Sequence, residues 1–461
     1  MAKSAMKDLT VGSPMKLVFG FAVPLLFGFL FQQMYNFVDT AIVGRFLGSA
    51  ALAAVGATGS LNFLILGFCM GICSGFSIPI AQSFGAKDEL ELRRYVTNSV
   101  WLSAVISVIL AVVTALGTRT MLQWMNTPAE IIDDAVSYIQ LIFAAIPVTV
   151  LYNLSGGILR ALGDSKTPVY YLVLASLINI VLDLACILYL HMGVAGAAFA
   201  TVVSQLVAGL GCVISMKRRF PILKSSREDW RFRPLFARRL VNIGVPMGLQ
   251  YSITAIGSVV LQIAVNGLGT VAVAAVTAAS KLSTVFTCVF DALATTMATF
   301  AGQNMGAKKL DRIHQGLRAA SVIGIVYCVL AFVIIWLGGR QLITLFVDAG
   351  DVEVVDKAYQ FLMVNVAFYI PLLYVNIVRL SVQGMGFTRV AVLAGCSEMV
   401  ARILVAMAFV PMVGFAAAAY ASPVAWIFAD AFLFPCYFSI MRKLRLRMYP
   451  AAENTASAAQ A

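Results

Sequence analysis

The sequence predicts an all-α polytopic membrane protein with 12 transmembrane helices, arranged as two pseudo-symmetric six-helix bundles. The first observation is composition: of 461 residues, 61% are hydrophobic and only 12% are charged, which is far outside the range of soluble globular proteins. The second is that apolar runs of about 20 or more residues, each long enough to cross a bilayer, alternate with short charged loops. The third is an internal repeat with a constant spacing.

The predicted spans follow in order from the apolar runs. The first run is too long for a signal-peptide core, so we expect it to remain as a membrane anchor. The runs lie near 15–42, 50–82, 95–118, 135–158, 168–190, 194–215, 240–266, 272–302, 317–338, 357–384, 390–410 and 414–440. The longest polar segment between them is a basic linker, which leaves no room for a soluble domain.

Lysine and arginine set the predicted orientation. The two termini and every second loop carry most of the basic residues, whereas the alternate loops contain only Arg45, Arg119, Arg340 and Lys357. Because basic residues are enriched in cytoplasmic loops, we expect both termini in the cytoplasm and a multi-pass location in the cell membrane.

The two halves of the chain repeat one another. The segment "LGSAALAAVGATGSL" at 47–61 matches "LGTVAVAAVTAASKL" at 268–282, and "QSFGAK" at 82–87 matches "QNMGAK" at 303–308. Both pairs have the same spacing of 221 residues. Six spans per repeat is an even number, so the halves enter the membrane in the same sense, and such parallel repeats place a transport site between or within them.

These patterns divide the chain into four predicted parts. We expect an N-terminal six-helix bundle over 1–216, a cytoplasmic basic linker over 217–239, a C-terminal six-helix bundle over 240–441 and a cytoplasmic tail over 442–461.

Composition also argues against other classes of protein. The formal charge of +12 lies in short clusters between apolar runs, which indicates membrane topology and no nucleic-acid partner. His191 and His314 stand alone in loops and all eight cysteines lie in apolar runs, so we expect no metal site beyond a possible Na⁺, no cofactor and no enzymatic activity. The sequence contains no GxxxxGK[ST] phosphate-binding loop, so an ion gradient must supply the energy.

Several motifs resemble the multidrug and toxic compound extrusion (MATE) family of cation-coupled efflux transporters, whose fold has two parallel six-helix bundles. The resemblance covers essentially the whole chain. The motifs are "PLLFGFLFQQMYNFVDTAIVGRFLG", "AQSFGAK", "GILRALGDSKTP", "INIVLD" and "GVAGAAFAT".

Within that family the chain resembles the branch of DNA-damage-inducible F-type proteins, whose coupling site lies in the N-terminal bundle. Carried over by motif, that site falls on Asp39, Asn179, Asp183 and Thr201. The other bacterial branch uses acids in helices 7 and 10, where this chain has no matching acid.

The residues themselves support the same cluster. A carboxylate at the centre of a transmembrane helix costs about 2.5–3.5 kcal/mol, so each one needs an explanation. Counting from the helix ends, Asp39 lies about 9 Å, Asp183 about 12 Å and Thr201 about 15 Å from the outer surface. Asn179 and Asp183 share one helix face because they are four residues apart. Such oxygen ligands suit Na⁺, and paired carboxylates also suit a proton carrier, so the choice of ion stays open.

Simpler roles remain open for individual residues. Asp39 could be a helix-end residue close to water, and the Thr201 hydroxyl could bond its own helix backbone. Pro24 in helix 1 is a candidate kink that couples ion binding to helix bending. Candidates for the substrate cavity, each with packing as the alternative, are Gln32, Met34, Tyr35, Asn36, Asn153, Asp291 and Glu398. For Glu398 the alternative is an intrahelical ion pair with Arg402.

The function that follows is a cation-coupled (H⁺ or Na⁺) antiporter of the MATE family. We expect it to export amphipathic, often cationic, drugs or toxic metabolites across the cytoplasmic membrane by alternating access. The alternative is a lipid-linked oligosaccharide flippase of the same superfamily. The expected partners are small drug-like molecules and the lipid bilayer, and the expected state is a monomer.

Overall fold

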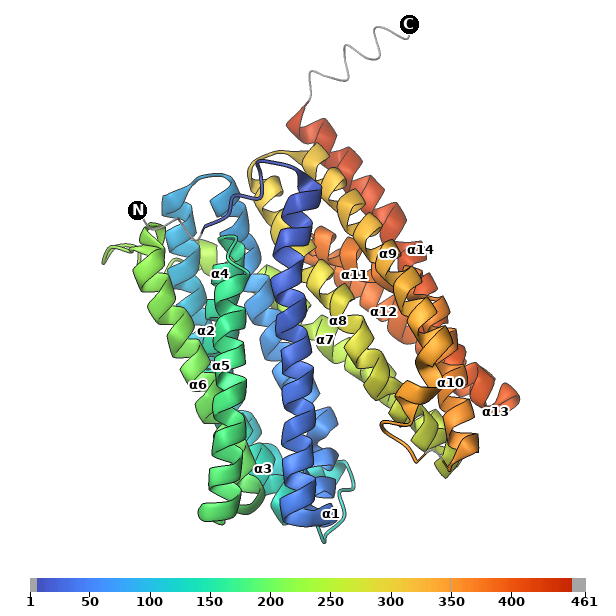
Figure 1. Ribbon diagram of the computed structural model, residues 1–461. Helices are drawn as coiled ribbons and strands as arrows, with labels where there is room; N and C mark the ends of the chain where they lie inside the picture. The colour runs from blue at the N-terminus through green and yellow to red at the C-terminus, as the bar shows by residue number, and fades with distance from the viewer. Residues whose placement is uncertain (1–5, 349, 450–461) are drawn as a thin grey trace, which may run out of the picture. The chain divides into compact units, whose positions relative to one another are not determined.

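The computed structural model describes residues 6–348 and 350–449, so residues 450–461 of the expected C-terminal tail lie outside it. Every regular element in these residues is helical (Figure 1). The helices are α1 (Pro14–Gly85), α2 (Glu89–Trp124), α3 (Ile132–Ala144), α4 (Ile146–Ala161), α5 (Lys166–Leu184), η1 (Ala185–Tyr189), α6 (Gly193–Arg219), η2 (Pro221–Leu223), α7 (Pro234–Asn266), α8 (Thr270–Gly306), α9 (Leu310–Ile343), α10 (Val352–Ala367), α11 (Tyr369–Gly384), α12 (Thr388–Leu404), η3 (Val405–Phe409), α13 (Val410–Val413) and α14 (Phe415–Met448).

The 72-residue helix α1 contains two membrane spans. Gly48 interrupts it with φ 87° and ψ 180°, a conformation that is open to glycine and strongly disfavoured for other residues. Two further spans are each built from two helices with a bend between them, of 48° between α3 and α4 and of 51° between α10 and α11. With α1 counted twice and each bent pair once, the described residues contain the twelve predicted spans, and the all-α membrane fold is confirmed.

The internal repeat is visible in the backbone as well as in the sequence. Gly48 and Gly269 both have positive φ and precede a span, and Lys87 and Lys308 both have φ near 58° after one. Each pair is separated by 221 residues. The same local fold therefore recurs in both halves.

Each half also contains one π-helical turn. The turn η1 follows α5 directly, and η3 follows α12 directly. A π-helical turn inserts one extra residue into an α-helix and is frequent at functional sites. Both turns lie in the fifth span of their half.

Contacts divide the chain into two compact units. Unit 1 contains Val23–Phe84 and Asp88–Ala255, and unit 2 contains Leu9–Ala22 and the described part of Ile256–Ala461. The beginning of α7 therefore packs in unit 1, and the first turns of α1 pack in unit 2.

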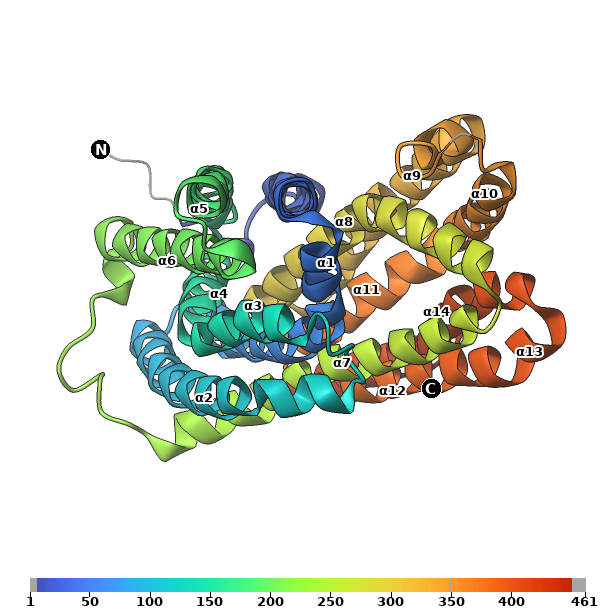
Figure 2. The ribbon, with the colours of Figure 1, turned by 90° about the horizontal axis from the view of Figure 1, so that it is seen from below.

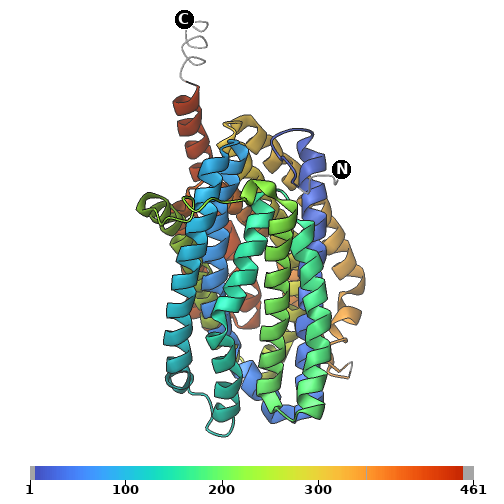
Figure 3. The same ribbon diagram turned by 90° about the vertical axis from the view of Figure 1, so that its left-hand side faces the viewer.

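Unit 1 is held together by close helix contacts. The helices α5 and α6, green in Figure 3, run side by side, and α4 packs on α6. The second span of α1 approaches α7 through glycines: a Cβ on Gly75 would lie 2.5 Å from the Cα of Gly244, and one on Gly71 would lie 2.7 Å from the Cα of Gly248. Small residues at membrane helix contacts allow this close backbone approach.

Unit 2 is also held together by direct contacts between its helices. The helices α8 and α11 pack together, α9 packs on α10, and α12 packs on α14 (Figure 2). The segment Leu9–Ala22 is tied to this unit because Arg312 Nη2 donates to the backbone carbonyl of Gly12 at 3.0 Å.

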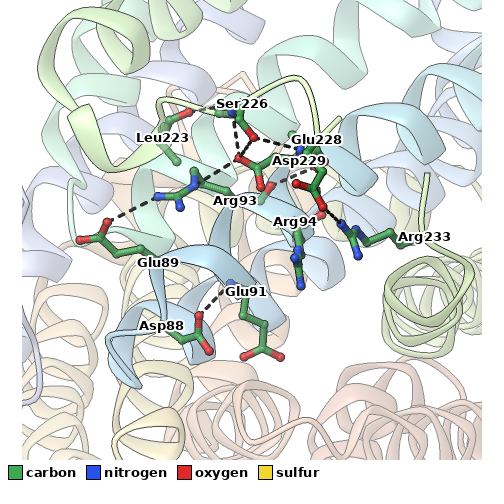
Figure 4. Close-up of polar contacts among 12 residues, drawn as sticks. Asp88, Glu89, Glu91, Arg93, Arg94, Leu223, Ser226, Glu228, Asp229 and Arg233 are labelled. Carbon is green, nitrogen blue, oxygen red and sulfur yellow. Dashed lines mark hydrogen bonds and ion pairs between the residues drawn. The ribbon is translucent and has the colours of Figure 1, made fainter. Parts of the chain in front are cut away.

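The linker between α6 and α7 is anchored on α2 (Figure 4). Asp229, only 4% exposed, accepts hydrogen bonds from the Ser226 amide and hydroxyl and lies 3.4 Å from Arg93 Nε. Thr97 Oγ1 donates to the Asp229 carbonyl at 2.6 Å. Burial acts to raise the Asp229 pKa, but the Ser226 hydrogen bonds and the charges of Arg93 and Arg94 hold that pKa below its ordinary value.

Two further contacts extend this anchorage along α2. The Trp101 indole donates to the Trp230 carbonyl at 3.0 Å, and the Arg233 amide donates to Asn98 Oδ1 at 2.9 Å. The basic linker is thus an ordered part of unit 1.

Candidate functional site

A cavity of about 450 Å³ lies inside unit 1. Both spans of α1 line it, together with α3, α4, α5, α6 and α7. Its polar and aromatic lining residues include Gln32, Tyr35, Asn36, Asp39, Asn62, Phe63, Tyr138, Thr149, Tyr152, Asn153, Ser176, Asn179, Thr201, Ser204, Gln205 and Tyr251.

Three helices meet through hydrogen bonds at Thr201 of α6. Asn179 Nδ2 of α5 donates to Thr201 Oγ1 at 3.3 Å, and the Tyr35 hydroxyl of α1 lies 3.2 Å from the same oxygen. Within the described residues, the Thr201 side chain therefore bonds across helices and not to its own backbone.

Asp39 and Asp183 lie beside this group. The two carboxyl groups are within electrostatic range of one another, and Asp183 is fully buried one helical turn beyond Asn179. Among the described residues, Asp39 Oδ1, Asn179 Oδ1 and both carboxylate oxygens of Asp183 are buried without a hydrogen-bond partner. Buried polar atoms normally have a partner, so these oxygens have unused capacity to accept a proton or a cation.

The donor set fits a hard ion. Two carboxylates, one carboxamide oxygen and one hydroxyl are the oxygen ligands that hard cations prefer. When the two carboxylates share one proton or one cation, their mutual repulsion is relieved. The arrangement can therefore hold one small positive charge inside the membrane.

Most of the expected cavity residues of unit 1 line the cavity, and one does not. The cavity is lined by Asp39 of α1 together with the expected residues Gln32, Tyr35, Asn36 and Asn153. Met34, on the other face of α1, is 62% exposed and does not line it.

Tyr138 and Gln205 line the cavity but were not among the residues expected from the sequence. Tyr138 of α3 is 8% exposed and lies within electrostatic range of Asp39 and Asp183, but a single tyrosine in an apolar run looks like ordinary packing. Gln205 accepts a hydrogen bond from Thr149 Oγ1 at 2.7 Å. Its position four residues after Thr201, on the same helix face, is a signal that could have identified it.

Asp291 and Glu398 belong to a second charged cluster, in unit 2. Glu398 lies between two guanidinium groups, at 2.8 Å from Arg402 Nη2 and 3.2 Å from Arg379 Nη1. Asp291 and Asp430 both lie within electrostatic range of Arg379. Arg379 lies within the predicted span 357–384, but its position opposite Glu398 has no spacing signal because the two residues lie on different helices.

The backbone of α1 is helical through Pro24. The boundary between the two compact units falls directly before it, between Ala22 and Val23. Pro24 therefore lies where α1 passes from one unit to the other.

Within the described residues, twelve membrane spans in two repeats and an oxygen-lined cavity inside unit 1 are the features of a polytopic membrane transporter. The family model MatE matches residues 24–185 and 246–408, which are most of both repeats. The chain belongs to the MatE family.

Curated relatives support the same family, and a solved structure supports the same fold. The chain is 30% identical to the probable multidrug resistance protein YoeA of Bacillus subtilis, over 76% of this chain and 77% of that protein. It is 25% identical to the DNA damage-inducible protein F of Escherichia coli, over 75% of each. A crystal structure of MATE in complex with MaL6 superposes with a TM-score of 0.90 at 22% identity, covering 96% of this chain and 100% of that one. The predicted family is confirmed.

Proposed function

We propose that the protein is a cation-coupled antiporter that exports amphipathic, often cationic, compounds across the cytoplasmic membrane. The observation that carries this proposal is the group formed by Asp39, Asn179, Asp183 and Thr201, which has four buried oxygens free to accept. Asp39, Asn179 and Thr201 line the cavity. The multidrug resistance relative supports the direction and class of substrate. The coupling ion is H⁺ or Na⁺.

The cavity suits a drug-sized molecule. Ligand pockets are typically about 300–1,000 Å³, and this one falls within that range. Tyr35, Tyr138, Tyr152 and Tyr251 present aromatic rings to it, and such rings attract organic cations. An ion bound at Asp39 and Asp183 and a cationic substrate in the cavity would compete for the same negative potential. This competition is the basis for exchanging one for the other across the membrane.

The energy of an ion gradient is sufficient to drive export of a substrate against its own gradient. One charge crossing about 100 mV gives about 2.3 kcal/mol, and a tenfold ion gradient gives about 1.4 kcal/mol. One or two ions per cycle could support a substrate gradient of about a hundredfold. Because Pro24 lies at the boundary between the two units, bending or straightening of α1 there would couple the ion site to alternating access.

The cavity chemistry favours export of cations over the flippase alternative. A lipid-linked oligosaccharide carries phosphate groups, which require basic residues nearby. No lysine or arginine lines this cavity among the described residues.

The proposed membrane arrangement follows from the basic residues. The positive charges at both termini and in the linker support a cytoplasmic location for these segments. Each chain contains a complete candidate site within unit 1, which is consistent with a monomer as the working unit.

The test is transport in proteoliposomes under imposed proton or sodium gradients, with ethidium as the probe substrate. We expect Asp39→Asn to lose ion-driven ethidium transport. The matched control is Asp133→Asn, which changes a 79% exposed side chain of the same unit and should transport normally. Undiminished ion-driven transport by Asp39→Asn would refute the assignment, and a response to pH alone would identify the proton as the coupling ion.

A further inference from the structure

A second pocket, of about 530 Å³, lies in unit 2 where the first turns of α9 meet the last turns of α14. His314 and Arg318 line it from α9, and Tyr437, Arg442 and Arg445 line it from α14. His314 and Arg318 are four residues apart on α9, and Arg442 and Arg445 are three residues apart on α14, so each pair shares one helix face.

The pocket has an excess of positive charge. Arg445 Nη2 pairs with Asp311 Oδ1 at 2.6 Å, which neutralises one arginine. Arg318 and Arg442 have neither an ion pair nor a hydrogen bond within residues 6–348 and 350–449. Two permanent positive charges therefore face the same space.

Tyr437 supplies an independent indication of a ligand. Its side chain is only 1% exposed, and in the described part of the chain its buried hydroxyl has no hydrogen-bond partner. A buried hydroxyl without a partner costs about 1–3 kcal/mol, so an acceptor in this pocket would stabilise it. An oxygen anion is the acceptor that the two arginines also attract.

The level of the pocket matches lipid headgroups. Both α9 and α14 have 34 residues, and at 1.5 Å per residue each is about 51 Å long, against about 30 Å of hydrocarbon. Each helix end therefore extends about 10 Å beyond the hydrocarbon. Tyr437 to Arg445 covers the part of α14 between about 4 and 17 Å from its last residue, Met448, so the pocket lies at the boundary between hydrocarbon and headgroups.

Apolar side chains complete the site. Phe438, which is 58% exposed, and Met441 line the same pocket beside Arg442. A cationic group next to exposed apolar side chains suits a ligand with a phosphate and acyl chains better than a free phosphate.

We propose that this pocket binds the phosphate of an anionic phospholipid such as phosphatidylglycerol. Arg318 and Arg442 supply the charge for the phosphodiester, the Tyr437 hydroxyl donates to one of its oxygens, and Phe438 contacts the acyl chains. Basic pockets between membrane helices are known settings for anionic headgroups. A bound lipid would join α9 to α14 at their ends. This inference is independent of the proposed ion and drug transport.

The test measures lipid retention on the purified full-length chain by native mass spectrometry, with phosphatidylglycerol or phosphatidylcholine added at equal amounts. We expect a preference for phosphatidylglycerol that falls about tenfold or more in R318Q/R442Q. The matched control K443Q/R447Q removes two charges from α14 outside the pocket and should keep the preference. Tyr437→Phe, which removes only the hydroxyl, should weaken retention by about threefold or more.

Two results from the unmodified chain and the charge variants would overturn the proposal. One is equal retention of both lipids by the unmodified chain. The other is loss of preference in K443Q/R447Q equal to that in R318Q/R442Q, which would show a general charge effect. If R318Q/R442Q fails to fold, Tyr437→Phe decides: unchanged retention in that variant would refute the site. Glycerol 1-phosphate that competes as strongly as the lipid would overturn the lipid as the source of the phosphate.

Discussion

Glu398→Gln tests whether the charged cluster of unit 2 holds its helices together. Glu398 is 5% exposed and is the acceptor for Arg402 at 2.8 Å and for Arg379 at 3.2 Å, so the neutral side chain would leave two guanidinium groups in a buried setting without their shared counter-charge. Breaking a buried ion pair by removing one partner costs about 3–5 kcal/mol.

The lower end of that range applies here. Arg379 keeps Asp291 and Asp430 within electrostatic range after the substitution, so only Arg402 loses its main partner. We expect the free energy of unfolding of the detergent-solubilised chain to fall by about 3 kcal/mol.

The assay is denaturant unfolding followed by the fluorescence of the five tryptophans. The matched control is Glu353→Gln, which also breaks a four-residue-spaced ion pair, with Lys357 at 2.9 Å, but at a position where the glutamate side chain is 69% exposed. An exposed pair of this kind contributes about 0.3–0.5 kcal/mol. Equal destabilisation by the two variants would refute the reasoning.

Three further predictions concern unit 1. Because the Asp229 pKa is depressed in the folded chain, its contribution to linker anchorage is present above the ordinary aspartate pKa of about 4 and is lost as pH falls through the lower folded value. Asp229→Asn should therefore increase tryptic cleavage of the linker at neutral pH, and unchanged cleavage would contradict this. Gly75→Ala should destabilise the chain by about 1–3 kcal/mol in the same unfolding assay. Gly56→Ala, where an added Cβ meets nothing within 4 Å, should be neutral or stabilising, and equal effects would refute the close-approach argument. Thr201→Val should reduce ion-driven ethidium transport several-fold, whereas Thr40→Val, which loses only a bond to its own helix backbone, should not; equal transport rates would rule out a role for the Thr201 hydroxyl.

Much of the fold could be predicted because length and charge control it directly. The twelve spans follow from apolar runs of bilayer length, and the repeat places Gly48 and Gly269 at equivalent turns. The helix breaks at Ala145 and Phe368 were not predicted, because the apolar pattern continues across them and the bend depends on packing.

The depth of the candidate site residues in the membrane could be predicted, but the helices that lie beside them could not. Rise per residue placed Asp39, Asp183 and Thr201 at similar levels, and the structure brings them together. Depth says nothing about which helices are adjacent, so the approach of Tyr138 to the acids and of Arg379 to Glu398 could not be inferred.

The two π-helical turns show how the duplicated halves have diverged. Each turn follows a pair of polar residues spaced by four on the preceding helix, Asn179 and Asp183 before η1, and Glu398 and Arg402 before η3. In the second half the pair is a closed salt bridge that neutralises itself. In the first half the pair contains one acid and no base, so within the described residues it forms no salt bridge. The two pairs are not equivalent positions of the repeat, because Asn179 and Asp183 correspond to Val400 and Leu404 at the 221-residue spacing. The internal brace of one half and the unpaired acid of the other therefore lie on different faces of the corresponding helices.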